Sequence, residues 1–281
     1  MKASVTDRYC VMGHPVEHSK SPWIHARFAQ LAGEDVEYTK RLVPLGGFAE
    51  AVEQFRFEGG RGCNVTVPFK FEAAALATRL SARAALAGAC NTLKFEAEGE
   101  VFGDNTDGAG LVNDLQRNAR FAIAGRDVLV VGAGGAAAGL LGPFIEARPR
   151  SLKVANRTVA KARALCDRHA ALASEHGVAL ACLALNEVRA PADLVVNATA
   201  SSMSGDMVSL PHDLLRPGSL AVDLMYGPAA AAFLAWATSC SANARDGLGM
   251  LVEQAAAAFE LWRGVRPDAA RVLAELRALP A

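Results

Sequence analysis

The stretch Asp127–Val131 and the residues after it constrain the fold of this chain more than any other segment. Asp127–Val131 reads DVLVV, a continuous apolar run that is typical of a strand buried on both faces of a parallel sheet. It leads into Gly132-Ala133-Gly134-Gly135-Ala136-Ala137, with glycine at the first and third positions and alanine at the sixth. This spacing permits a tight turn, a close approach of backbone to a pyrophosphate, and close packing of helix on strand. The segment therefore predicts a dinucleotide-binding βαβ unit, whose glycine-rich loop at Gly132–Gly139 holds the pyrophosphate at a helix N-terminus.

Strand and helix signals alternate along the rest of the chain. Further apolar strands are expected in the second half at Leu152–Ala155, Val178–Cys182, Leu194–Asn197 and Leu220–Asp223. In the first third, strands are expected at Arg8–Met12, Val36–Val43 and Gly62–Val67, with a hairpin formed by Asn91–Phe95 and Glu100–Phe102. Helices are expected from Ser21, taken as a capping residue, and over Phe48–Phe57, Met250–Trp262 and Asp268–Leu279, and the segment Ala73–Leu86 is expected to be mostly helical.

This rhythm predicts an α/β fold of two domains. One is an N-terminal α/β domain completed by the C-terminal helices, over residues 1–106 and 248–281. The other is a Rossmann-type doubly wound parallel sheet over residues 107–247. We expect the dinucleotide in the second domain, the substrate in the first, and the active site in the interdomain cleft.

The residues at the end of the second expected Rossmann strand indicate which dinucleotide binds. NAD-specific domains place an acidic residue there for the ribose hydroxyls. Here the chain reads Asn156-Arg157-Thr158, with Lys161 one turn into the following helix. Two cations and two hydrogen-bonding side chains suit a 2′-phosphate, so the pattern favours NADP(H) over NAD. The alternative is that Arg157 is a solvated loop residue.

Two segments in the first domain carry residues suited to carbonyl reduction. Asn64-Val65-Thr66-Val67-Pro68-Phe69-Lys70 ends a strand and delivers a lysine, and Gly103-Asp104-Asn105-Thr106-Asp107-Gly108 delivers an aspartate. A lysine aimed by a carboxylate could protonate a carbonyl oxygen while a hydride arrives from the nicotinamide. The residues alone leave open whether Lys70 and Asp107 meet or are surface charges.

A set of motifs in matching order resembles the NADP-dependent shikimate dehydrogenase family from about Tyr9 to Trp262. The motifs are Ser19-Lys20-Ser21-Pro22, Asn64–Lys70, Gly88-Ala89-Cys90-Asn91-Thr92, Gly103–Gly108, Gly132–Ala136, Asn156–Thr158 and Asp246–Ala256. The resemblance implies the reversible reduction of 3-dehydroshikimate to shikimate by NADPH in aromatic amino-acid biosynthesis.

The resemblance also implies a role for individual residues. Lys70 and Asp107 match the catalytic pair of the family. The residues that match substrate-binding positions are Ser19 and Ser21 at the carboxylate, Asn64, Thr66, Asn91 and Gln254 at the ring, and Tyr226 near the carboxylate. The residues that match cofactor-binding positions are Gly132, Ala133, Gly134, Gly135, Ala136, Asn156, Arg157, Thr158, Lys161, Thr199, Leu224 and Gly247. Ala82, where the family often has an acidic residue, and the apolar loop Gly227–Ala232 depart from the pattern.

Composition narrows the partners and the location. Lys+Arg and Asp+Glu both number 29, so no broad surface for nucleic acid or membrane is expected. The apolar run near the N-terminus is too short for a signal peptide, and six scattered cysteines without a CxxC pair indicate reduced thiols, so we expect a cytoplasmic protein, monomeric or homodimeric. His14, His18 and His25 have only Glu17 beside them, so no metal is expected.

Two alternatives remain. One is a quinate/shikimate dehydrogenase that uses both NAD and NADP, against which Asn156-Arg157-Thr158 argues. The other is a non-catalytic NADPH-binding sensor that keeps the fold. The presence of both Lys70 and Asp107 argues against such a sensor.

Overall fold

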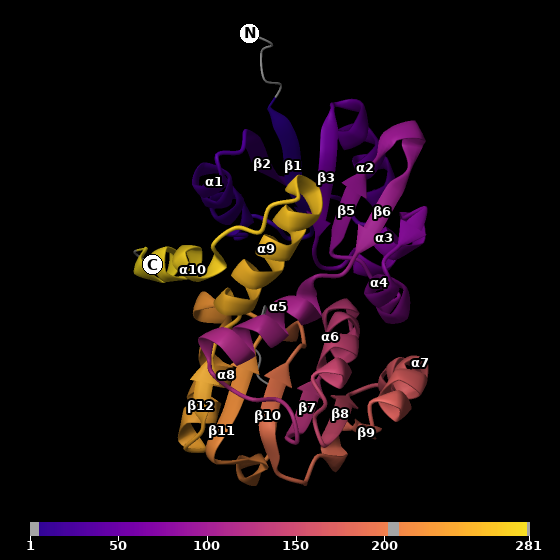
Figure 1. Cartoon of the computed structure of the whole chain (residues 1–281). Helices are drawn as coiled ribbons and strands as arrows, with labels where there is room; N and C mark the ends of the chain where they lie inside the picture. The colour runs from indigo at the N-terminus through magenta and orange to yellow at the C-terminus, as the bar shows by residue number, and fades with distance from the viewer. Residues whose placement is uncertain (1–5, 202–207, 280–281) are drawn as a thin grey trace. The chain divides into compact units, whose positions relative to one another are not determined.

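The computed structural model describes residues 6–201 and 208–279. The chain divides into two compact units, Met1–Gly110 with Leu251–Pro280, and Leu111–Met250 with the terminal Ala281. Each unit contains its own six-stranded sheet, so the predicted pair of α/β domains is confirmed (Figure 1).

The sheet of the first unit is mixed, in the order β2-β1-β3-β5-β6-β4. Strands β1, β2 and β3 are parallel, β5 runs antiparallel to β3 and to β6, and β4 runs parallel to β6. The strands are β1 (Asp7–Gly13), β2 (Val36–Leu42), β3 (Gly60–Val65), β4 (Arg79–Leu80), β5 (Thr92–Phe95) and β6 (Val101–Asp104). The helices of this unit are α1 (Ser21–Ala32), α2 (Phe48–Phe57), α3 (Lys70–Leu76), α4 (Ala82–Ala87) and α10 (Ala269–Ala278). Two further helices, α5 (Asp107–Asn113) and α9 (Leu248–Arg263), begin in one unit and end in the other.

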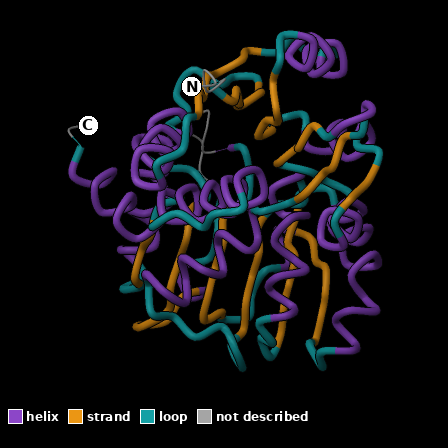
Figure 2. Tube along the Cα trace, turned by 45° about the horizontal axis from the view of Figure 1, so that its top comes forward, coloured by secondary structure: helices purple, strands orange, loops and turns teal. Residues whose placement is uncertain are grey.

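The sheet of the second unit is entirely parallel, in the order β12-β11-β10-β7-β8-β9 (Figure 1). This is the strand order of a dinucleotide-binding domain, in which the first strand, β7, lies at the centre where the order reverses. Figure 2 shows the strands in orange and the helices in purple. The strands are β7 (Asp127–Val131), β8 (Ser151–Asn156), β9 (Ala179–Ala184), β10 (Ala192–Asn197), β11 (Leu215–Asp223) and β12 (Asn243–Arg245), and the helices are α6 (Gly135–Glu146), α7 (Val159–Glu175) and α8 (Ala231–Ser239). Helix α7 packs against β8 and β9, and α8 packs against β11 and β12.

Two predictions about the first unit were wrong in detail. The segment Ala73–Leu86 is helical at both ends but is interrupted, because α3 ends at Leu76 and the backbone N–H groups of Thr78 and Ser81 donate to carbonyls of β6, which forms the short strand β4. Ser21 does not cap α1. Lys20 occupies the cap position, Ser21 is the first helical residue, and the Ser19 hydroxyl oxygen accepts the Ser21 backbone N–H at 3.3 Å.

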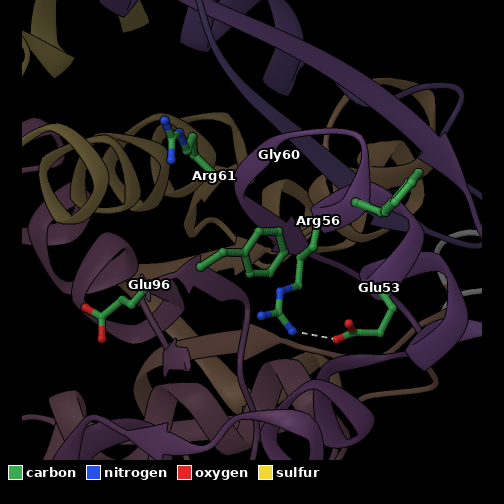
Figure 3. A pocket seen from close by; sticks show the side chains of 7 residues that line it. Glu53, Arg56, Gly60, Arg61 and Glu96 are labelled. Atoms are coloured by element: carbon green, nitrogen blue, oxygen red, sulfur yellow. Dashed lines mark hydrogen bonds and ion pairs between the residues drawn. The ribbon is translucent and has the colours of Figure 1, made fainter. Parts of the chain in front are cut away.

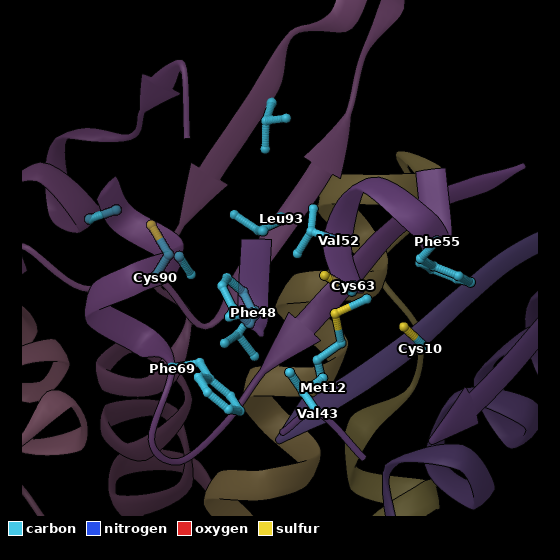
Figure 4. Packing of buried hydrophobic residues seen from close by; sticks show 14 residues of the cluster. Cys10, Met12, Val43, Phe48, Val52, Phe55, Cys63, Phe69, Cys90 and Leu93 are labelled. Atoms are coloured by element: carbon cyan, nitrogen blue, oxygen red, sulfur yellow. The ribbon is translucent and has the colours of Figure 1, made fainter. Parts of the chain in front are cut away.

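An apolar core fills the space between the first sheet and the helices α2 and α3 (Figure 4). Cys10, Met12 and Cys63 enter it from β1 and β3, and the rings of Phe48 and Phe69 stack at 5.2 Å between centroids. Both cysteines are fully buried and pack as small hydrophobic side chains. This packing fixes the carboxyl ends of β1 and β3, from which the chain continues toward Ser19 and Lys70.

A second group of buried rings lies over β1 and β2. The ring of His25 in α1 stacks on the ring of Tyr38, with 4.1 Å between the ring centroids and 4° between the ring planes. The ring of Tyr9 stacks on that of Trp262, with 4.4 Å between the centroids. Within the described part of the chain, neither ring nitrogen of His25 has a hydrogen-bond partner. Burial lowers the pKa of His25 to about 3, with the nearby Asn64 side chain opposing the shift. His25 is therefore neutral in the folded protein over the whole neutral and mildly acidic range.

We predict that His25 makes the protein less stable in acid. The pKa of His25 is 6.5 in the unfolded chain and about 3 in the folded protein, so between these pH values only the unfolded chain binds a proton there. The free energy of unfolding therefore falls as the pH falls through this window. Urea unfolding at about pH 7.5 and about pH 5 should show a loss about 2 kcal/mol larger for the unsubstituted protein than for His25→Phe. Equal losses in the two proteins would contradict the prediction. The buried His169 is present in both proteins and cancels.

Candidate active site

The structure brings Lys70 and Asp107 together, although 37 positions separate them in the chain. Lys70 begins α3 and Asp107 begins α5, and the Lys70 Nζ lies 2.6 Å from the Asp107 Oδ2. The side chains are only 12% and 6% exposed. A nearly dry ion pair requires other hydrogen bonds to the carboxylate, because the ions lose most of their hydration.

The backbone near Ala89 and Cys90 fixes both ends of this pair. The Cys90 N–H donates to the carbonyl of Lys70 at 2.8 Å. Asn105 donates its side-chain N–H to the Ala89 carbonyl at 2.8 Å and accepts the backbone N–H of Asp107 at 3.2 Å. The lysine and the aspartate are thus held by one short segment, which limits how far they can separate.

The side chain of Asn91, just before β5, contacts Asp107 and two further polar side chains. Its Nδ2 lies 2.8 Å from the Asp107 Oδ1, 2.9 Å from the Thr106 Oγ1 and 3.1 Å from the Gln254 Oε1 of α9. Asn91 is 3% exposed and Gln254 is 7% exposed. Two predicted ring-binding residues therefore lie beside the predicted catalytic aspartate, and both belong to the first unit.

Asn64 at the end of β3 is held against the same site. Its Nδ2 donates to the Asn91 carbonyl at 3.2 Å and to the Thr92 Oγ1 at 3.0 Å, and its Oδ1 accepts from the Tyr38 hydroxyl at 2.7 Å. No role was predicted from the sequence for Tyr38, and Thr92 entered only as the last residue of the motif Gly88–Thr92. Both are residue types that favour strands, so their position in β2 and β5 carried no separate signal.

The predicted carboxylate-binding serines lie at the start of α1, in the same unit. Ser19 is half-buried and Ser21 is buried at 4% exposure, near the Tyr38 hydroxyl. Ser21 is the first residue of the helix rather than its cap. Thr66 follows β3 and is half-buried, and its backbone N–H donates to the Met12 carbonyl at 2.9 Å.

The predicted cofactor residues of the second unit lie at the carboxyl ends of its central strands. Gly132 follows β7 with a φ of 116°, and a Cβ there would lie 2.9 Å from the carbonyl of Ala198. Gly134 precedes the first residue of α6. Thr199 follows β10, and its backbone N lies 3.2 Å from the position that a Gly132 Cβ would take. Ligands of parallel α/β sheets bind at this edge.

A buried pair that sequence analysis missed holds two of these loops. Asn197 at the end of β10 donates to the Asp223 Oδ2 at the end of β11 over 2.9 Å. The Asn197 Oδ1 accepts from the Thr199 hydroxyl at 2.8 Å, and the Asp223 Oδ1 accepts from the Met225 N–H at 2.8 Å. Each residue of the pair is the last residue of an apolar strand. The sequence therefore indicated only where the two strands end.

The loops after β11 and β12 also meet. A Cβ on Gly247 would lie 2.1 Å from the carbonyl oxygen of Leu224, so only glycine fits there. The Gly247 N–H donates to the Met225 carbonyl at 2.8 Å. Tyr226 lies in this second unit and is half-buried, whereas the other predicted substrate residues belong to the first unit.

The predicted 2′-phosphate residues follow β8, the strand next to β7. Asn156 ends that strand and donates its side-chain N–H to the Thr158 carbonyl at 2.9 Å, which shapes the turn into α7. Arg157, Thr158 and Lys161 are exposed. Two exposed cations, Arg157 and Lys161, therefore follow the strand next to the one that leads into the glycine-rich turn.

A surface depression of the first unit is a different feature. It has a volume of about 350 Å³ and is lined by charged and aromatic side chains, among them the Glu53–Arg56 ion pair at 2.7 Å (Figure 3). No predicted site residue lines it. Over the described ranges, no three His, Cys, Asp or Glu side chains are grouped as metal ligands would be. Among the same residues, no helix combines the length and the apolarity needed to span a bilayer.

The fold and the two sites define a two-domain α/β protein of the dinucleotide-binding class. Comparison with known families matches residues 11–93 to the "Shikimate dehydrogenase substrate binding domain", residues 115–208 to "Shikimate / quinate 5-dehydrogenase" and residues 247–277 to "Shikimate 5'-dehydrogenase C-terminal domain". The "Shikimate dehydrogenase (NADP(+))" of Acidovorax sp. (strain JS42) is 61% identical over 98% of this chain and 97% of its own length. The chain belongs to the shikimate dehydrogenase family.

Solved structures agree with this family. An "Ael1 enzyme" from Pseudomonas putida superposes with a TM-score of 0.86 at 44% identity, covering 98% of this chain and 99% of its own. The shikimate 5-dehydrogenase of Thermus thermophilus in complex with NADP(H) and shikimate superposes with a TM-score of 0.82 at 34% identity, covering 97% of this chain and 100% of its own. The resemblance predicted from the motifs is thereby confirmed.

We predict that Gly132→Ala destabilises the second unit more than Gly218→Ala does. Both glycines have a positive φ, 116° and 88°, but an added Cβ meets the Ala198 backbone only at Gly132 and open space at Gly218. The extra overlap should cost about 1–3 kcal/mol. Urea unfolding followed by the fluorescence of Trp236, the tryptophan of this unit, measures the difference. Equal losses would show that the contact with Ala198 is unimportant.

Proposed function

We propose that the protein is an NADP-dependent oxidoreductase that reversibly reduces 3-dehydroshikimate to shikimate in aromatic amino-acid biosynthesis. The observation that carries this proposal is the buried contact of 2.6 Å between Lys70 and Asp107, in a chain that belongs to the shikimate dehydrogenase family. A non-catalytic sensor has no need of a nearly dry lysine–carboxylate pair, which is costly to bury.

Lys70 is the proton donor in this proposal. Its Nζ carries the proton that the carbonyl oxygen of the substrate takes up as that oxygen becomes negative. Asp107 keeps Lys70 charged and aimed, and the Asn91 amide holds the other oxygen of the carboxylate at 2.8 Å. NADPH, when bound, supplies the hydride. In the reverse direction Lys70 accepts the proton of the substrate hydroxyl.

The substrate side chains are neutral hydrogen-bonding groups, as a small polyhydroxylated acid requires. Such a site rejects analogues that lack a hydroxyl, because buried polar groups are then left unpaired. The hydroxyls of Ser19 and Ser21 are proposed to bind the substrate carboxylate, with Tyr226 near it. The groups proposed to bind the ring are Asn64, Thr66, Asn91 and Gln254.

The glycine-rich turn fits a dinucleotide. Gly134 has a φ of −90°, which any residue adopts, and an added Cβ there meets no protein atom within 4 Å. Nothing inside the protein therefore requires glycine at this position, whereas a pyrophosphate packed against the backbone does. Thr199, Leu224 and Gly247 are proposed to line the ribose and nicotinamide pocket, and Ala133, Gly135 and Ala136 complete the loop.

The remaining expectations belong to the same proposal. Asn156, Arg157, Thr158 and Lys161 are proposed to bind the 2′-phosphate and the adenosine ribose of NADP(H). We further propose a cytoplasmic protein that acts as a monomer or homodimer. The domain limits 1–106 with 248–281, and 107–247, remain our proposal for the substrate and cofactor domains.

We predict that Lys70→Ala and Asp107→Ala each lower kcat by about 10²–10⁴-fold, the size of a general acid contribution. Binding of NADPH should stay nearly normal, because both residues lie in the first unit. The assay follows the absorbance of the reduced nicotinamide with shikimate and NADP. Lys94→Ala is the control, since the Lys94 Nζ pairs with Glu96 at 4.0 Å and is not among the residues proposed for the site. Full activity of either variant would rule out the assignment.

We predict that Arg157→Ser raises the KM for NADP about 10- to 100-fold, the equivalent of one charge-assisted hydrogen bond. The KM for NAD should not rise, because NAD has no 2′-phosphate. Arg216→Ser is the matched control, because Arg216 is exposed and lies at the opposite end of its strand. Comparable rates of the unsubstituted protein with NAD and NADP would favour the quinate/shikimate alternative, and activity with quinate would support it.

A further inference from the structure

The polarity of the hydrogen bonds around Asn64 can be derived from one backbone group. The carbonyl of Asn91 can only accept a hydrogen bond, so the atom of the Asn64 amide that faces it at 3.2 Å is the nitrogen. The Asn64 Oδ1 then faces the Tyr38 hydroxyl at 2.7 Å and accepts its proton. Both protons of the Asn64 nitrogen are used, one on the Asn91 carbonyl and one on the Thr92 Oγ1.

The polarity around Asn91 is fixed in the same way. The backbone N–H of Thr106 can only donate, and it lies 2.8 Å from the Asn91 Oδ1. The nitrogen of the Asn91 amide therefore faces the Asp107 Oδ1 at 2.8 Å and donates to it. The carboxylate receives this bond on one oxygen and the bond from Lys70 on the other.

Thr92 connects the two amides. Its hydroxyl accepts from Asn64, so its single proton is free for another acceptor. The Asn91 Oδ1 lies 2.9 Å away and takes it. Thr92 has no exposed surface, and Tyr38 is 9% exposed, so water does not compete strongly for either hydroxyl.

All of these bonds point in one direction. The Tyr38 hydroxyl donates to Asn64, Asn64 to Thr92, Thr92 to Asn91, and Asn91 to Asp107, which also accepts from Lys70. Hydrogen bonds that point the same way polarise one another, and in a buried site they act as a unit. This series of hydrogen bonds ends at the Asp107 carboxylate, because an ionised carboxylate accepts hydrogen bonds and has no proton to donate.

We propose that Tyr38 and Thr92 are positioning residues for the reaction: through this directed chain they hold the Asp107 carboxylate, and with it Lys70, in the orientation that catalysis needs. The inference rests on the proposed function for its activity readout. It assigns a role to the hydroxyls of two residues that do not contact the catalytic lysine.

The surroundings of Tyr38 support its place at the start of the chain. Burial raises the pKa of Tyr38, while the nearby Ser21 hydroxyl opposes the shift, so the phenol keeps its proton and remains a donor. The ring of His25 stacks on it at 4.1 Å and restricts its rotation. Ser21 and Asn64, both proposed to bind substrate, thus share one fixed neighbour.

The test compares Thr92→Val, which keeps the shape and removes the hydroxyl, with Thr92→Ser, which keeps the hydroxyl. Losing one such bond should lower kcat about five- to tenfold in Thr92→Val, with the KM for shikimate and for NADP changed by less than about threefold. Thr92→Ser should retain kcat within about twofold of the unsubstituted protein. Thr78→Val is the matched control, because Thr78 makes two hydrogen bonds with Val101 in the same unit and lies outside the chain.

A second pair of variants tests the other end of the chain. Tyr38→Phe should lower kcat about two- to fivefold, whereas Tyr9→Phe should not change it. Tyr9 is the register partner of Tyr38 on β1, is also buried and contacts the same Trp262, but takes no part in the chain. If Thr92→Val does not fold by circular dichroism, the comparison of these two variants decides.

A readout without turnover separates this inference from the proposed function. The rate at which Lys70 reacts with an amine-directed acylating reagent, measured by peptide mapping, should rise in Thr92→Val and Tyr38→Phe and stay unchanged in Thr92→Ser, Thr78→Val and Tyr9→Phe. An inactive unsubstituted protein that shows this pattern would refute the proposed function alone. The inference is overturned if Thr92→Val behaves like the unsubstituted protein, if Thr92→Ser is equally damaged, or if only KM changes.

Discussion

The side-chain amide of Asn91 is the contact on which the site of the first unit depends. It lies where β5, α5 and α9 meet, and it joins Asp107, Thr106 and Gln254 from segments that are far apart in the sequence. A buried amide without partners would cost several kcal/mol, roughly 2–7. Its oxygen and nitrogen are both satisfied here, so the same contacts that avoid this cost also fix the orientation of the carboxylate proposed to be catalytic.

In the second unit, the parallel sheet brings loops from distant parts of the sequence together. Its sheet is parallel throughout, so the ends of β7, β8, β10 and β11 share one edge, and loops from distant parts of the chain meet there. The Asn197–Asp223 pair ties two of these loops, and glycine at positions 132 and 247 lets backbones approach where a Cβ would overlap. The edge proposed to bind the cofactor is thus built from backbone shape, and the site proposed to bind the substrate is built from side-chain hydrogen bonds.

The strands predicted most accurately are those with the longest runs of apolar residues. The run DVLVV before the glycine turn is long and apolar enough to specify a buried strand, and β7 has the predicted limits. Strands β4 and β12 have only two and three residues, too few for any periodicity, and they form because a neighbouring strand offers free backbone groups. The roles of the Tyr38 and Thr92 hydroxyls were not predicted, because both residue types favour strands and only the structure shows that each hydroxyl faces a side-chain amide.

The sequence by itself determined the two α/β domains, the glycine-rich turn and, through its motifs, the family, because these depend on local patterns of apolar, glycine and charged residues. Only the tertiary structure decided that Lys70 and Asp107 meet, that Ser21 is not a helix cap, and that four neutral side chains point their hydrogen bonds toward one carboxylate. The physical reason is that a hydrogen bond depends on distance and direction. Neither quantity is encoded by the spacing of residues that come from separate strands and helices.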